Sequence, residues 1–151
     1  MAVVSKFAES FIVGLFSGTF NLPSDSLKVA LLNTSFTFDA ESDEDWADIS
    51  SDEIAATYGY TADGIALTGV AVAATGTASD GVINITCTNN PTWTASGGAI
   101  ATVGGAAIID HTIGTPKIVM VIDFGADYAT VDGKIFQVNF SNGIGTATIV
   151  V

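Results

Sequence analysis

The chain has 151 residues, with 16 acidic side chains against four lysines and no arginine, which gives a formal net charge of -12. Four scattered lysines cannot neutralise a row of phosphates, so this composition excludes a nucleic-acid-binding surface and argues against an anionic membrane. Only 13% of residues are charged and 48% are hydrophobic, so much of the surface must be uncharged. The uncharged run at 10–24 is too short for a transmembrane helix, which needs about 20 apolar residues.

The N-terminal residues have the spacing of a short amphipathic helix. Ser5 is placed to cap its first turn, and Gly18 and Pro23 end the pattern. About three turns are marginal in water, so we expect an N-terminal helical arm over residues 1–22 that docks on another surface. Its apolar side chains form two adjacent stripes at i, i+4 spacing: Phe7, Phe11 and Leu15, then Ala8, Ile12 and Phe16.

An acidic run follows the first predicted strand. That strand covers 27–32, where every second side chain is Leu or Val. Residues 39–53 then hold eight carboxylates and no base, which predicts a solvated loop because like charges repel. Carboxylate oxygens bind Ca²⁺, so the run also offers a candidate calcium site, although it lacks the glycine and the glutamate spacing of an EF-hand. The candidate ligands are Asp39, Glu41, Asp43 and Asp45.

From residue 57 onward the sequence alternates between β-prone runs and glycine-bearing turns. Asn142-Gly143 predicts a tight hairpin between 136–140 and 145–149. Short strands without βαβ alternation predict a mainly β fold, an antiparallel β-sandwich or jelly-roll-like single domain over 23–151, with one short N-terminal helix. The later candidate strands are 65–74, 82–88, 99–110, 117–124, 134–140 and 144–151.

The sequence offers little for catalysis. Its one histidine, His111, stands beside Asp110 near a predicted strand end, where neighbouring side chains point to opposite faces. The paired glycines lack the spacing of a phosphate-binding loop. We therefore expect neither an enzyme nor a bound cofactor.

Three aromatic side chains in or near the acidic run have two interpretations. Trp46 stands among carboxylates, either as an anchor folded back onto the domain or as a contact for a ligand or partner. Together with Tyr58 and Tyr60 it forms a candidate receptor-binding surface.

Several strings, in order along most of the chain, resemble small structural proteins of tailed-bacteriophage virions. The Gly/Ala/Thr-rich middle, 70–116, departs from that pattern and leaves its strand register open. The strings that carry the resemblance are KFAESF (6–11), LFSGTFNL (15–22), DSLKVALL (25–32), DEIA (52–55), YGYTADGIALTG (58–69), VIDFGAD (121–127) and FQVNFSNGI (136–144).

The resemblance implies a virion protein without catalytic residues, made in the host cytoplasm and placed on the capsid surface. Several such proteins decorate or cement the capsid, which implies a homotrimer or dimer bound to the major capsid protein. A head or tail fibre or adsorption module that binds a host glycan or receptor is the main alternative, and a connector or tail component is another.

On this interpretation the N-terminal helix is the expected capsid or partner interface. Alternatively, the helix covers one open end of its own β-domain. The residues expected to touch the partner are Phe7, Phe11, Ile12, Leu15 and Phe16.

Overall fold

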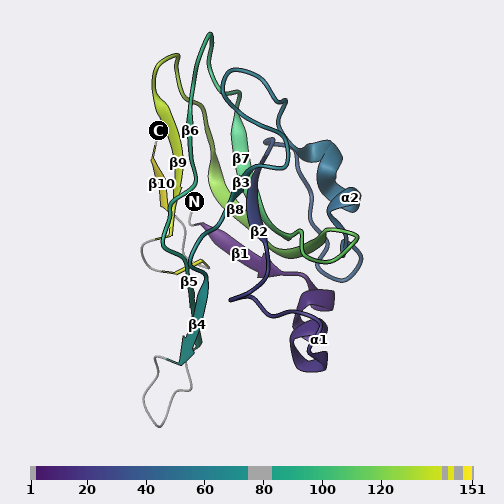
Figure 1. The fold of residues 1–151 in the computed structure, drawn as a ribbon. Coiled ribbons are helices and arrows are strands. Elements are labelled where there is room, and N and C mark those ends of the chain that lie inside the picture. The colour runs from purple at the N-terminus through teal and green to yellow at the C-terminus, as the bar shows by residue number, and fades with distance from the viewer. Residues whose placement is uncertain (1–2, 75–82, 141–142, 145–147, 151) are drawn as a thin grey trace.

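A computed structural model describes residues 3–74, 83–140, 143–144 and 148–150. This described part of the chain is mainly β, and all strand pairs within it are antiparallel (Figure 1). The elements are β1 Val4–Phe7, α1 Glu9–Ser17, β2 Leu27–Leu32, α2 Trp46–Ile49, a 3₁₀ turn η1 Ser50–Asp52, β3 Ile65–Ala66, β4 Ala71–Ala74, β5 Ile83–Thr86, β6 Thr92–Thr94, β7 Val103–Asp110, β8 Lys117–Tyr128, β9 Ile135–Asn139 and β10 Thr148–Val150.

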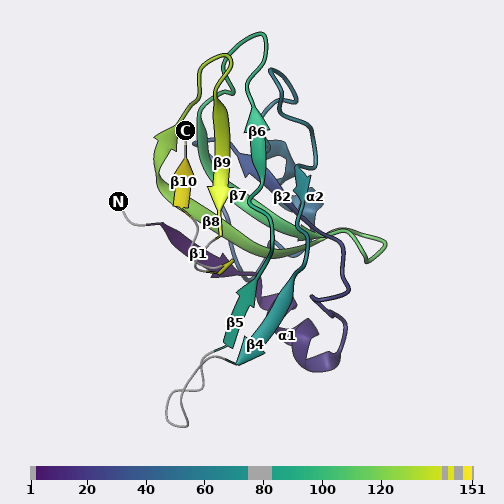
Figure 2. The same ribbon diagram turned by 60° about the vertical axis from the view of Figure 1, so that its left-hand side comes forward.

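The largest sheet has five strands in the order β1-β8-β7-β2-β3. Every residue of β7 is buried, so both faces of this sheet are covered at its centre. On one side lies the three-stranded sheet β10-β9-β6, and α2 lies on the opposite side (Figures 1 and 2). The ring of Phe124 on β8 lies 6.4 Å from that of Phe136 on β9, which joins the two sheets.

Strand β2 is buried on both of its faces. The alternation at 27–32 places Leu27, Val29 and Leu31 on one face and Lys28 on the other, yet Ala30 and Leu32 on the second face are as fully buried as Val29 and Leu31. The residues after β2 run back over the sheet and cover that second face. At Gly105 a β-carbon would lie 2.6 Å from the ring of Phe36, so glycine makes room for this covering segment.

Most predicted strands are confirmed, with shorter or shifted bounds. The range 65–74 is divided, because β3 joins the large sheet whereas β4 pairs with β5 in a separate hairpin. The antiparallel pairing of β9 with β10 confirms a terminal hairpin, but Asn139 pairs with Thr148, so the connection is longer than the tight turn predicted at Asn142-Gly143. Asn142 itself lies outside the described residues. Two short strands, β1 and β6, were not predicted.

The N-terminal segment differs from the predicted arm. Ser5 does not cap a helix, because it lies in β1, which pairs with β8 at the edge of the large sheet. The helix begins at Glu9 after Ala8, and Gly18 ends it in the left-handed conformation with its N–H directed to Leu15 O. This segment is therefore tied into the sheet before the helix starts.

The acidic run, 39–53, is more ordered than a solvated loop. It contains α2 and η1, and Asp48 Oδ2 accepts hydrogen bonds from the backbone N–H groups of Glu44 and Asp45. Trp46 and Ile49 on α2 are buried. We call residues 39–53 the acidic segment. Across the part of the chain that the structure describes, no helix is long and apolar enough to cross a membrane.

Candidate functional site

Helix α1 presents an apolar face to solvent. Phe16 is 91% exposed and Val13 is 67% exposed. Ile12 and Leu15 on the same helix are each more than one third exposed, as is Phe7 on the preceding strand β1. Scattered apolar residues are normal on a protein surface, but a contiguous group on one helix is typical of an interaction site.

Phe11, which was predicted to touch a partner, lies instead in the protein's own core and is completely buried. Its ring stacks on Phe7 at 5.6 Å between centroids and meets the edge of Phe20 at 5.0 Å. The backbone of Gly14 lies close to the Phe20 ring, leaving no room for a β-carbon. The helix thus covers its own domain with Phe11 while Val13 and Phe16 remain exposed.

A cleft of about 450 Å³ separates α1 from the acidic segment. The two are joined by a backbone hydrogen bond from Glu9 N to Ala40 O, 2.9 Å long. We call this space the helix cleft. The residues that line it are Glu9, Ser10, Val13, Gly14, Ser17, Thr19, Phe20, Glu41, Glu44, Ile113 and Lys117.

The one lysine of the helix cleft is already paired. Lys117 Nζ lies 2.6 Å from Asp45 Oδ1. The hydrogen bond to Asp45 is the main cause that raises the pKa of Lys117, and the nearby Glu44 and Asp48 charges add to it. The Lys117 ammonium therefore neutralises Asp45 of the acidic segment. The other charged residues that line the cleft, Glu9, Glu41 and Glu44, give it an excess of negative charge.

The candidate calcium ligands do not converge on a common point. Asp43 Oδ2 accepts from the N–H of Asp39, Asp39 Oδ1 accepts from the N–H of Glu41, and Asp45 pairs with Lys117. These bonds close local turns. Within residues 3–74, 83–140, 143–144 and 148–150, no three His, Cys, Asp or Glu side chains gather as a metal site requires.

Two of the three aromatic candidates for receptor binding are buried, which corrects that prediction. Trp46 is an anchor, with its indole Nε1 donating to Asp63 Oδ1 at 3.3 Å. Tyr60 is also buried, and its hydroxyl donates to Glu53 Oε1 at 2.6 Å while accepting from Leu31 N at 3.0 Å. Only Tyr58 is about half exposed.

Replacing Tyr60 by phenylalanine is expected to lower the free energy of unfolding by about 1–3 kcal/mol, because the buried Leu31 N–H loses its acceptor. Burial already raises the pKa of Glu53, so losing the phenol bond to this carboxylate adds to the cost. The measurement is urea unfolding. Tyr58→Phe is the matched control and should change stability little. An equal effect of the two substitutions would contradict the assignment.

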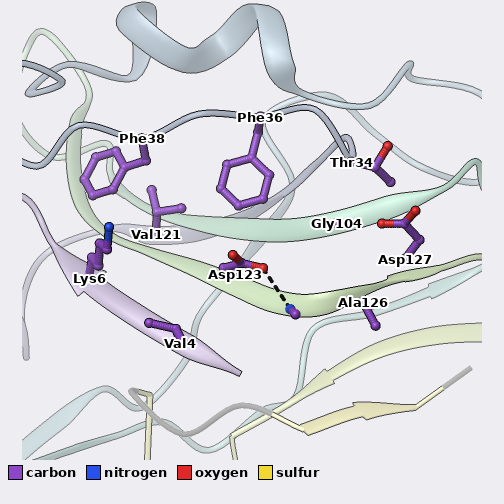
Figure 3. Close-up of a pocket in the computed structure, with 11 residues that line it drawn as sticks. Val4, Lys6, Thr34, Phe36, Phe38, Gly104, Val121, Asp123, Ala126 and Asp127 are labelled. Atoms are coloured by element: carbon purple, nitrogen blue, oxygen red, sulfur yellow. Dashed lines mark hydrogen bonds between the residues drawn. The ribbon is translucent and has the colours of Figure 1, made fainter. Parts of the chain in front are cut away.

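A second space, of about 550 Å³, lies between β1, β8 and the segment that carries Phe36 and Phe38 (Figure 3). We call it the sheet groove. It combines the two aromatic rings with Lys6, Asp123 and Asp127. Asp123 Oδ1 accepts from Gly125 N at 2.8 Å, so part of its hydrogen-bonding capacity is used locally. These groups offer a mixed apolar and polar lining.

Asp25 and Asp110 form a pair of neighbouring carboxyl groups where the chain enters β2. Asp110 is fully buried, and its Oδ1 accepts from Thr112 N at 2.7 Å. His111, the other candidate for chemistry, donates its backbone N–H to Ser26 O, and burial lowers the pKa of its imidazole. Asp110 thus bonds to the turn that follows His111, and its carboxyl group acts on the neighbouring Asp25 through their proximity.

Asp25→Asn is expected to stabilise the protein at neutral pH. Burial raises the pKa of Asp25, the Asp110 carboxylate raises it further, and the hydrogen bond from Asn21 N opposes them. Because the pKa of Asp25 is higher in the folded state, the wild-type protein is most stable while this carboxyl is protonated, below its unfolded-state pKa of about 3.9. That stability is lost as the pH rises through the folded-state pKa, whereas the uncharged Asn side chain does not titrate. The variant's advantage in thermal midpoint should therefore vanish near pH 3. An advantage that does not change with pH, or an equal one in Asp132→Asn, would contradict this account.

Comparison with known proteins assigns no relative: no family model, no curated protein and no solved structure matches the chain.

Proposed function

We propose that this chain is a structural virion protein of a tailed bacteriophage, a capsid decoration or cement protein that binds the major capsid lattice and stabilises the mature head. The observation that supports this most is the apolar face of α1, where Val13 and Phe16 stand in solvent on a helix fixed to the domain by Phe11. A rigid, exposed apolar face is suited to binding another protein.

The composition supports the same proposal. Only 13% of residues are charged, and the cores of protein interfaces are depleted in charge. A decoration protein that touches neighbouring capsid subunits only in their mature arrangement shifts the equilibrium of the lattice toward that arrangement. Because many copies bind around one shell, a modest affinity at each site adds up to a large stabilisation of the whole shell.

The proposal includes a β-sandwich or jelly-roll-like architecture and a homotrimer or dimer that sits on the head. Packing of β9 against β8 through Phe136 and Phe124 is the contact expected between two sheet layers. The chain acts by binding and not by catalysis, without a cofactor. Its working location is the capsid surface, after synthesis in the host cytoplasm.

A head or tail fibre or adsorption module is the second candidate, and the sheet groove is the observation that favours it. Phe36 and Phe38 beside Lys6 and Asp127 offer both apolar and polar contacts to a sugar or receptor segment. This groove replaces the buried Trp46 and Tyr60 as the candidate surface. A connector or tail component, the remaining candidate, would also bind other virion proteins but would not bind the capsid lattice.

Copy number separates these functions. A cement protein is expected in hundreds of copies per particle, whereas a fibre, connector or adsorption module needs a dozen or fewer. The measurement is quantitative gel or mass-spectrometric stoichiometry of purified virions of the encoding phage, relative to the major capsid protein. A dozen copies or fewer would rule out cementing.

A further inference from the structure

The charge and the apolar rim of the helix cleft indicate which kind of ligand it binds. We propose that the cleft and the exposed residues Val13 and Phe16 together bind a segment of another protein in which Lys or Arg stands beside a large apolar side chain. The inference rests on the proposed function in taking that other protein to be the major capsid protein. The reasons are the charge of the cleft, its apolar rim and the scarcity of bases in this chain.

Charge is the first reason. Glu9, Glu41 and Glu44 line the cleft with exposed side chains, and the only base among its lining residues, Lys117, is held by Asp45 at 2.6 Å. A cationic side chain entering here meets a lining with three carboxylates and no unpaired base. Charge pairing of this kind directs approach and fixes the register of a partner.

The apolar rim is the second reason. Val13 is both exposed and part of the cleft lining, and Phe16 lies one turn further along the same helix. Residues three apart share a helix face, so one ligand segment can touch both. The matching ligand therefore needs a base for the cleft and an apolar side chain for the rim.

The third reason distinguishes another protein from a second copy of this chain. The chain carries four lysines and no arginine, and one of those lysines already pairs with Asp45. Two copies with a net charge of -12 each would also repel one another. A cleft that attracts basic side chains is thus poorly matched to a second copy of this chain. Contacts between copies would use other surfaces.

The first arm of the test measures binding of the full chain to capsid shells of the encoding phage that lack it. The affinity is expected to fall with added NaCl, and the triple variant Glu9→Gln/Glu41→Gln/Glu44→Gln should bind about tenfold or more weakly. The matched control Asp52→Asn/Asp63→Asn/Asp132→Asn removes the same number of charges at residues that line neither the helix cleft nor the sheet groove, and it should bind like the wild type. Circular dichroism and thermal unfolding of all three proteins establish that they are folded.

The second arm needs no capsid. An NMR titration uses two synthetic peptides with the same Leu and Phe residues, one carrying Arg and the other carrying Glu. The Arg peptide is expected to give saturable shifts at Glu9, Val13 and Glu44, and the Glu peptide none.

The outcomes separate the two proposals. If the wild-type protein does not bind the shells, the proposed capsid function is contradicted. Chemical-shift changes with the Arg peptide would in that case still support the cleft as a binding site for a basic and apolar segment. Shell binding that is unchanged in the glutamine variant overturns the cleft inference and leaves the capsid function standing. Absent or delocalised shifts with the Arg peptide also overturn it. Self-association of the wild type that the glutamine variant abolishes would identify a second copy as the occupant and overturn the choice of partner.

Discussion

Replacing Phe11 by alanine is expected to lower the free energy of unfolding by about 3–5 kcal/mol, because it removes a fully buried ring. For a chain of this size the thermal midpoint should fall by roughly 10 °C. Phe11 contacts both Phe7 and Phe20, so the cavity would lie where β1, α1 and the chain toward β2 meet. The measurement is calorimetric or urea unfolding.

Phe16 on the same helix is the matched control for that loss. Its side chain is almost entirely in solvent, so Phe16→Ala should change stability by no more than about 0.5 kcal/mol. The same substitution is expected to weaken capsid binding by about tenfold or more, because it removes the largest apolar anchor of the exposed face. A Phe16→Ala protein that unfolds as readily as Phe11→Ala would contradict the placement of α1. Full capsid affinity in Phe16→Ala would remove this face from the interface.

Replacing Gly64 by alanine is expected to destabilise the protein by more than about 4 kcal/mol. Gly64 has a φ of +70°, which is unfavourable for a residue with a β-carbon. The added carbon would collide with the carbonyl oxygen of Val29 and lie 2.8 Å from Ala30 Cα. Because β3 starts at the next residue and Ile65 pairs with Val29, the clash would push β3 off β2.

Gly97→Ala isolates the conformational part of this effect. Gly97 has a similar φ of +78°, and a β-carbon there would meet nothing within 4 Å. The expected cost is only about 1–2 kcal/mol. Chemical denaturation of the two variants measures the difference, which reports the close approach of the two backbones. Equal costs would show that β2 does not lie against Gly64.

Regular local patterns predicted much of the β-structure. The alternation at 27–32 and the β-branched residues of 117–124 and 134–140 were sufficient to locate β2, β8 and β9. Strand β6 consists of three residues and has no pattern of its own, and it exists because Trp93 pairs with Phe136. Strand β1 was taken for the first turn of a helix, since four residues before a helical stripe fit either structure.

Long-range contacts explain why the candidate site was predicted only in part. The helical stripe identified α1 but could not tell that Phe11 faces inward and Phe16 outward, because that choice depends on Phe20 and the sheet. Likewise, the partners of Tyr60 are Leu31 and Glu53, neither of them adjacent in sequence. Charge repulsion correctly predicted exposure for four carboxylates of the acidic segment, Asp39, Glu41, Glu44 and Asp48, whereas the other four are partly buried. It gave no sign that Glu41 and Glu44 would lie beside the N-terminal helix.

The central claim is that this chain decorates a phage capsid, and cryo-electron microscopy of the encoding phage tests it most directly. The account predicts density for this domain at regular lattice positions on the mature head, with α1 and the helix cleft turned toward the major capsid protein. Density confined to the neck or tail, or virions that lack the protein, would contradict the account.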